Sequence, residues 1–254
     1  MKKIIATLAL GALLSSSLYA DFGRLEMGIG GWSYEPEGTS TYTENSLLEG
    51  TNTLRKKEDT SIYAWMLIKH PIPILPNLRL EYANIASKGV AKGKFNNFTA
   101  PLNSATSIEL TQFDIVPYYN LLDNTFYTTL DLGVAFKVVQ ADFKAEGVSY
   151  DGFTDTDYTD SVNLLIPLAY ARLRFEIPVI NIGLESDAKY VTYKESTVYD
   201  LRVKIDYTLE SLPVIQPAFE VGYRVQNYKI VSDDDKSKLD MEFAGFYAGV
   251  MLRF

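Results

Sequence analysis

The side chains able to do chemistry are few in this chain of 254 residues, which has one histidine, His70, and no cysteine. Thiol nucleophiles, disulfides, cysteine-ligated zinc and multi-histidine metal sites are therefore excluded. Histidine is the residue type best suited to general base catalysis near neutral pH. His70, however, precedes a proline-rich turn, where a solvated turn residue is the better interpretation. We predict no catalytic residue and no cofactor.

Carboxylates are the other candidate reactive groups. Glu109 and Asp114 could act as an acid pair in hydrolysis, although nothing in their spacing singles them out. The run 233–235 is acidic, and a second acidic group lies in the segment 141–161. Such carboxylates could bind Ca²⁺ or bridge divalent ions to lipopolysaccharide, but their spacing does not match an EF-hand loop. Solvated loop residues are the preferred interpretation, and the weak metal-ligand candidates are Asp151, Asp155, Asp157 and Asp160.

Composition limits the elements that can position these groups. The formal net charge is −8, and 47% of the residues are apolar. An acidic balance argues against nucleic-acid binding, and the apolar content argues against disorder. The length fits one domain, because large all-β barrels reach this size.

The first twenty residues have the pattern of a secretory signal peptide. Lys2 and Lys3 form a charged region, a short apolar run follows over 4–14, and Ala20 supplies the small residue before a cleavage site. The apolar run is too short to span a bilayer. We therefore predict a signal peptide, 1–20, that directs export through the inner membrane, and one domain over 21–254.

Alternation with period two dominates the remaining chain, as in strands with two different faces. Over 201–210 every odd position is apolar and every even position is polar or charged. No run of about 18 apolar residues follows the signal, so no transmembrane helix is predicted. We expect about ten strands, with 8–12 possible, at 22–34, 60–70, 77–87, 106–119, 125–140, 162–176, 181–194, 198–210, 217–231 and 241–254.

The predicted connections alternate between two kinds. Short turns, mostly apolar and proline-containing, are expected at 70–77, 120–124, 177–181 and 212–217. Polar and mostly longer connections are expected at 35–59, 88–105, 141–161, 195–197 and 232–240. Short turns at one end and long polar loops at the other are typical of outer-membrane barrels. Pro167 lies inside the strand 162–176 and predicts a bulge or a break there, because proline cannot complete a ladder hydrogen bond.

Period two does not tell which face of a strand looks outward. A soluble barrel would place its apolar face inside and would give the same pattern. The predicted export and the even strand number favour a membrane barrel. Tyrosines near strand ends favour it too, because aromatic belts mark both membrane interfaces. The tyrosines assigned to these belts are Tyr34, Tyr63, Tyr118, Tyr119, Tyr127, Tyr190, Tyr193, Tyr207 and Tyr228.

The last predicted strand, 241–254, ends on a phenylalanine and alternates apolar residues back from it. Its residues Phe246, Val250, Leu252 and Phe254 resemble the C-terminal signature of Gram-negative outer-membrane β-barrel proteins. The layout of 21–254 is similar to a small, functionally uncharacterised family of such barrels. The resemblance implies an all-β, up-and-down antiparallel transmembrane barrel in the bacterial outer membrane. It also implies contact with outer-membrane lipid and lipopolysaccharide, and recognition of the last strand by the barrel assembly machinery.

In a membrane barrel the polar face points inward. Charges of both signs interleave along it, so cross-strand ion pairs could satisfy them in a narrow interior. Ten strands with long charged side chains inside predict a plugged or very narrow lumen, because wide channels need about sixteen strands. The predicted lumen charge network consists of Glu185, Asp187, Lys189, Arg202, Lys204, Asp206, Glu220, Arg224 and Arg253.

Four functions follow from these observations. We expect a non-enzymatic outer-membrane barrel with a structural or surface-interaction role through its polar extracellular loops. A narrow pore for small solutes is the main alternative. Barrel enzymes that modify lipids or cleave proteins would, by resemblance, use a histidine at the outer rim or in the wall, whereas His70 is placed at the periplasmic end. A soluble periplasmic lipid-binding barrel is the remaining alternative.

Overall fold

The structure of the chain is a computed structural model that describes residues 23–44, 47–72, 74–177, 179–209, 215–232, 234 and 236–254. The predicted signal peptide lies outside these residues. No helix among the described residues is long and apolar enough to cross a membrane. The strands are β1 (Arg24–Glu44), β2 (Leu47–Leu54), β3 (Asp59–Lys69), β4 (Asn77–Lys94), β5 (Thr99–Thr125), β6 (Thr128–Tyr150), β7 (Phe153–Ile177), β8 (Ile182–Tyr193), β9 (Ser196–Thr208), β10 (Gln216–Val231) and β11 (Ser237–Arg253).

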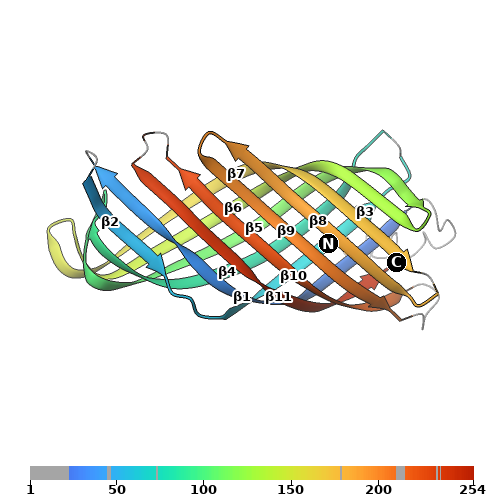
Figure 1. Cartoon of the computed structure of the whole chain (residues 1–254), viewed down its shortest axis with the longest axis horizontal. Coiled ribbons are helices and arrows are strands. Elements are labelled where there is room, and N and C mark those ends of the chain that lie inside the picture. Colours follow the sequence, from blue (N-terminus) through green and yellow to red (C-terminus); the bar gives the residue numbers. More distant parts are fainter. Residues whose placement is uncertain are drawn as a thin grey trace, which may run out of the picture.

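These strands form one antiparallel sheet that closes on itself, because β11 pairs with β1 (Figure 1). β2 and β3 share one position in the ring. β1 pairs with β3 over its first half and with β2 over its second half, and β4 pairs with both in the same way. The ring therefore has ten positions filled by eleven strands. The predicted all-β, up-and-down antiparallel barrel of about ten strands is confirmed.

The two ends of the barrel differ. We call the end where both ends of the described chain lie the N/C end, and the opposite end the far end (Figure 1). The N/C end also carries the β3–β4, β5–β6, β7–β8 and β9–β10 connections, and the far end carries the β4–β5, β6–β7, β8–β9 and β10–β11 connections. The far end is oblique. The β6–β7 hairpin projects farthest along the barrel axis, and the β8–β9 hairpin ends well short of it (Figure 1).

The wall of the barrel is apolar outside and charged inside. On β9, Leu201, Val203 and Ile205 point outward and are 43%, 52% and 50% exposed, whereas Arg202 and Lys204 between them are buried. β8, β10 and β11 repeat the scheme with outward leucine, valine, phenylalanine and tyrosine side chains. Exposing so much apolar surface to water costs about 25 cal/mol for each Å². The distribution is that of a transmembrane barrel and argues against the soluble alternative.

The prediction that nine tyrosines form outward belts is wrong for four of them. Tyr34, Tyr63, Tyr118 and Tyr228 occupy inward positions and are at most 5% exposed. The Tyr34 hydroxyl, for example, donates to the carbonyl of Ala86 at 2.8 Å inside the barrel. The other five are exposed: Tyr119, Tyr190 and Tyr207 at outward strand positions, Tyr127 in the β5–β6 turn and Tyr193 at the end of β8. On a strand, the odd or even position of a tyrosine decides whether its side chain points inward or outward, and nearness to the strand end does not.

Two of the predicted long loops are mostly strand. The β4–β5 connection covers only 95–98, and the β6–β7 connection covers only 151–152. The polar residues of 88–105 and 141–161 therefore belong mainly to strand extensions rather than to loops. Much of 35–59 is also strand, within β1 and β2. A strand that leaves the membrane meets water on its outer face, so its outward positions become polar without the strand ending.

The prediction of a bulge or break at Pro167 is wrong. Pro167 pairs with Phe136, and the register between β6 and β7 runs through it without a shift. β7 pairs with β8 only from Ala169 onward, so at Pro167 the strand has a partner on one side only. Proline is tolerated on such an edge, because there is no second ladder for it to interrupt.

Two glycines allow the seam between β1 and β11 to close. Gly30 and Gly249 are paired across it. A β-carbon at Gly30 would lie 2.6 Å from the Tyr63 hydroxyl, and one at Gly249 would lie 2.5 Å from the carbonyl oxygen of Ile29. Glycine at these positions therefore relieves crowding.

We expect Gly249→Ala to lower the free energy of unfolding by about 1–3 kcal/mol, because the added methyl group has no space at the seam. Gly31→Ala is the matched control: its β-carbon would meet only Thr60 Cγ2, at 3.9 Å, and the effect should stay within about 0.5 kcal/mol. Urea unfolding of the refolded barrel measures both. Equal stability of the two variants would contradict the crowding argument.

Candidate functional site

A neutral cluster of buried charges fills the middle of the barrel and its N/C half. The nine carboxylates and eight of the nine cations are buried, and Arg253, the ninth cation, is 11% exposed. We call this set the plug. Its members are Glu26, Glu81, Asp114, Asp131, Glu185, Asp187, Asp200, Asp206 and Glu220, with Arg79, Lys137, Arg172, Arg174, Lys189, Arg202, Lys204, Arg224 and Arg253.

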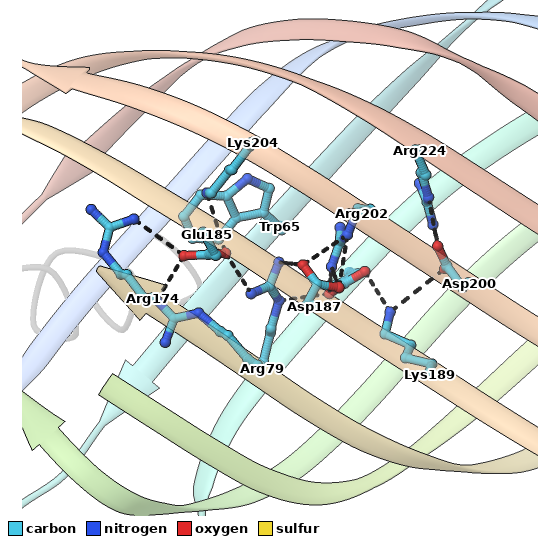
Figure 2. Close-up of polar contacts among 12 residues, drawn as sticks. Trp65, Arg79, Arg174, Glu185, Asp187, Lys189, Asp200, Arg202, Lys204 and Arg224 are labelled. Atoms are coloured by element: carbon cyan, nitrogen blue, oxygen red, sulfur yellow. Dashed lines mark hydrogen bonds and ion pairs between the residues drawn. The ribbon is translucent and has the colours of Figure 1, made fainter. Parts of the chain in front are cut away.

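Arg202 holds the centre of the plug (Figure 2). Its guanidinium donates from Nε to Asp187 at 3.0 Å and from Nη2 to Asp187 at 2.8 Å, and Nη2 also donates to Glu81 at 2.6 Å. Arg79 donates to the same Glu81 carboxylate at 2.6 Å and lies 3.8 Å from Asp187. The planar guanidinium suits such two-pronged pairing, so each carboxylate here contacts more than one cation.

A second group of pairs lies toward the N/C end. Arg174 donates through two nitrogens to Asp206, at 2.6 and 3.0 Å, and also to Glu185 at 3.2 Å. Arg172 joins Glu185 to Asp131, with bonds of 2.8 and 2.6 Å. The pairs link β6, β7, β8 and β9 across the interior, so they fix the strands to one another as well as filling the lumen.

Toward the far end the plug contains three carboxylates whose oxygens lie within 4.8 Å of one another, Glu81, Asp114 and Asp200. Such a group could hold a cation, but three protein cations, Lys137, Lys189 and Arg224, already pair with it. Lys189 Nζ lies 2.6 Å from Glu81 and contacts Asp114, and Lys137 Nζ lies 2.9 Å from Asp114. The arrangement is an ion-pair network, which needs no metal for charge balance.

Aromatic rings complete the plug. Trp65 has Lys204 Nζ 4.4 Å and Arg79 Cζ 5.2 Å from its ring centroid, and its indole N–H donates to Glu220 at 3.0 Å. Trp32 has Arg224 4.9 Å from its ring. Cation–π contacts of this kind are strongest where water is absent. The void among these side chains is about 10 Å³, hardly more than one water molecule needs.

The structure places all nine residues of the lumen network predicted from sequence inside the barrel, within the plug. Sequence reasoning missed the other nine members of the plug. Arg79 and Glu81 occupy successive inward positions of β4 and alternate with Leu78 and Leu80, and Lys137 occupies an inward position of β6. Their signal was the parity of the strand, because a charge in an alternating segment faces the polar side. The missed members are Glu26, Arg79, Glu81, Asp114, Asp131, Lys137, Arg172, Arg174 and Asp200.

The remaining catalytic candidates are not brought together. His70 lies at the N/C end, where its Nδ1 accepts from the N–H of Ile72 at 3.1 Å and its Nε2 contacts the carbonyl of Pro76 at 2.9 Å. Both ring nitrogens therefore serve the turn. Glu109 is exposed on the outer face of β5, whereas Asp114 is buried in the lumen, so these two carboxylates lie on opposite faces of the strand.

The weak metal candidates do not share a loop. Asp151 lies in the β6–β7 turn, while Asp155, Asp157 and Asp160 lie on β7. Asp157 pairs with Lys144 at 3.0 Å, and hydrogen bonds from Lys144 to Glu146 and Asp157 raise the pKa of that lysine. Alternation sends Asp157 and Asp160 to different faces of the strand, which is why nearness in sequence brought no common site.

The acidic run 233–235 is described only at Asp234. Its carboxylate accepts from the Ser232 hydroxyl at 2.6 Å and from the N–H of Lys236 at 3.2 Å. These bonds lower the pKa of Asp234 and make it part of the turn that joins β10 to β11.

A different environment fills the lumen at the far end. A cavity of about 400 Å³ lies there. Its wall is mostly apolar, and it includes Phe98, Phe143, Leu164, Ile230 and Leu239. The interior is therefore divided into a charged plug and an apolar cavity, a division that the sequence did not predict.

Comparison with known proteins gives a likeness of fold only. No protein-family model matches the chain, and no curated protein matches it either. The chain is similar to the translocator domain of the autotransporter NalP from Neisseria meningitidis, with a TM-score of 0.44, 10% identity, and coverage of 100% of this chain and 96% of that chain. The transport unit of the autotransporter AIDA-I from Escherichia coli gives 0.38, 13%, 98% and 97%. A Pseudomonas aeruginosa FadL homologue gives 0.29, 8%, 95% and 92%. Likeness at these scores carries no argument about function.

Proposed function

We propose that the protein is an integral barrel of the bacterial outer membrane whose lumen is closed to ions and which has a structural or surface role rather than an enzymatic one. The observation that carries the proposal is the plug: nine carboxylates and nine cations occupy the lumen, and the void among its central side chains is only about 10 Å³. A conducting pore needs a continuous water-filled path, and this interior leaves no room for one.

The outward apolar belt and the unequal ends support the membrane placement. β8 and β9 have 12 and 13 residues, enough for the roughly 9–11 that a tilted strand needs to cross a bilayer. The far end, with its strand extensions, is the end we assign to the cell surface, and the N/C end is assigned to the periplasm. In this orientation the surface role falls to the extended hairpins, and lipopolysaccharide would contact their outer faces.

The last strand supports the proposed assembly route. Phe246, Val250 and Leu252 point outward on β11 and are 70%, 51% and 37% exposed. Phe254 closes the seam, since its N–H donates to the carbonyl of Leu25 at 2.9 Å. An apolar outward row on the closing strand is what assembly machinery could read before the barrel shuts.

The test is a conductance measurement on refolded protein in planar lipid bilayers. We expect no discrete current steps above the leak of the bare bilayer. Reproducible open levels from the unmodified protein would overturn the closed barrel and favour the narrow pore. Fractionation checks the location separately: the protein should appear only in the outer-membrane fraction, with heat-modifiable gel mobility, and release by osmotic shock would contradict that placement.

A further inference from the structure

The far-end cavity plays no part in the proposed function, yet it has the features of a ligand site. Its volume of about 400 Å³ lies within the range of about 300–1,000 Å³ found for small-molecule pockets. Its wall carries phenylalanine and aliphatic side chains. Water fills such a space poorly, because apolar walls offer it no hydrogen-bond partners.

The wall of the barrel has a notch beside this cavity. β7 pairs with β8 only between Ile177 and Ala169, so the part of β7 from Phe153 to Leu168 pairs with β6 alone. The β8–β9 hairpin ends at the pair Tyr193–Ser196, short of the neighbouring hairpins (Figure 1). Val162, which lines the cavity, is 49% exposed as a result.

The outer belt and the cavity meet at this notch. Leu165 points outward on β7 and is 66% exposed, while Val162 and Leu164 on the same stretch line the cavity. Tyr190 and Tyr193 are also exposed and lie at the far end of β8. Aromatic side chains at such a position mark a membrane interface. Apolar surface is thus continuous from the membrane-facing wall, over the edge of β7, into the lumen.

We propose that this cavity binds one hydrocarbon chain of an amphiphile, which enters over the β8–β9 hairpin. The chain must be uncharged, because the cavity wall is mostly apolar and burying an unpaired charge against it would be costly. The space is too small for a strand or helix of another protein. The polar head would lie at the rim, which offers amides, hydroxyls and charges from Asn96, Asn97, Ser232, Ser237, Asp160 and Lys238.

The test is displacement of dansyl-undecanoic acid from the refolded barrel, held in a fluorinated surfactant whose tails mix poorly with hydrocarbon. Free fatty acids and lysophosphatidylcholines of increasing chain length serve as competitors. Each added methylene should tighten binding about fourfold until the cavity is full. Displacement by lysolipid alone would identify the membrane as the source of the chain, and displacement by fatty acid alone would identify the medium. Absence of probe binding, or affinity independent of chain length, would overturn the proposal.

A matched pair of variants locates the site. Val162→Lys places an ammonium group at the cavity mouth, and Asn163→Lys places the same group on the opposite face of β7. Position 162 is half exposed, so neither variant has to bury a charge, and heat-modifiable mobility verifies that both fold. We expect binding to weaken about tenfold or more in Val162→Lys, because the charge must be desolvated by the chain, and to stay within about twofold in Asn163→Lys. Equal effects in the two variants would overturn the assignment. Because the cavity and the plug are separate, failure here would leave the conductance result unaffected.

Discussion

An Arg202→Met protein is expected to lose about 3–5 kcal/mol of its free energy of unfolding, the usual cost of removing one partner from a buried ion pair. Methionine keeps much of the side-chain volume, so the loss reports charge rather than space. Asp187 and Glu81, both buried, would lose the guanidinium that donates to them at 2.8 and 2.6 Å. Urea unfolding of the refolded barrel, followed by tryptophan fluorescence and gel mobility, measures the change.

Lys229→Met is the control for this variant, because Lys229 lies on β10 with its side chain exposed outside the barrel. Its effect should stay within about 0.5 kcal/mol. The double variant Asp187→Asn with Arg202→Met should lose less stability than the sum of the two single variants, since it leaves no unpaired charge at position 187. A strictly additive double variant would show that the two side chains do not act as a pair.

Removing the centre of the plug is expected to open the barrel to ions. The quadruple variant Arg79→Ala, Glu81→Ala, Asp187→Ala and Arg202→Ala removes two cations and two carboxylates that contact one another at 2.6–3.8 Å. The interior stays neutral, so the four lost side chains act through the volume they occupied. A ten-stranded ring is wide enough for water once these side chains are gone, because side chains fill barrels of this size.

Planar-bilayer recording should show discrete current steps, with a conductance about tenfold or more above the leak of the unmodified protein. Lys229→Met serves again as the control and should stay silent. If the quadruple variant folds, as judged by heat-modifiable mobility, and remains silent, the barrier to ions lies elsewhere in the lumen. If the unmodified protein conducts equally well, the plug is not a barrier at all.

Local pattern was enough to predict the type of fold. The alternation in 201–210 fixes which side chains of β9 share a face, whatever the strand pairs with. The same parity placed Arg202, Lys204 and Asp206 inside once the outward face was known to be apolar. Charged runs of this kind made nine members of the plug visible in the sequence.

Local pattern was misleading where a property depends on more than one strand. Polarity in 88–105 and 141–161 suggested loops, but those segments are strands that face water on their outer side. Tyr63 and Tyr228 lie near strand ends, yet both point into the lumen. Pro167 suggested a break, and it is tolerated because β8 does not reach it. The outcome at Pro167 depends on which neighbour is present, and a single strand carries no record of its neighbour.

The alternating pattern was enough to predict a barrel, its two faces and a charged interior, because alternation follows from the geometry of one strand. The pairing of particular charges depends on the folded barrel. Lys189 contacts Glu81 across 108 residues of chain, and Tyr63 donates to Glu220 across 157. Closure of the ring and its register set those pairs, together with the short β8–β9 hairpin beside a long β7. The same nonlocal geometry separates the neutral plug from the apolar cavity, so both proposals rest on contacts that the linear sequence does not contain.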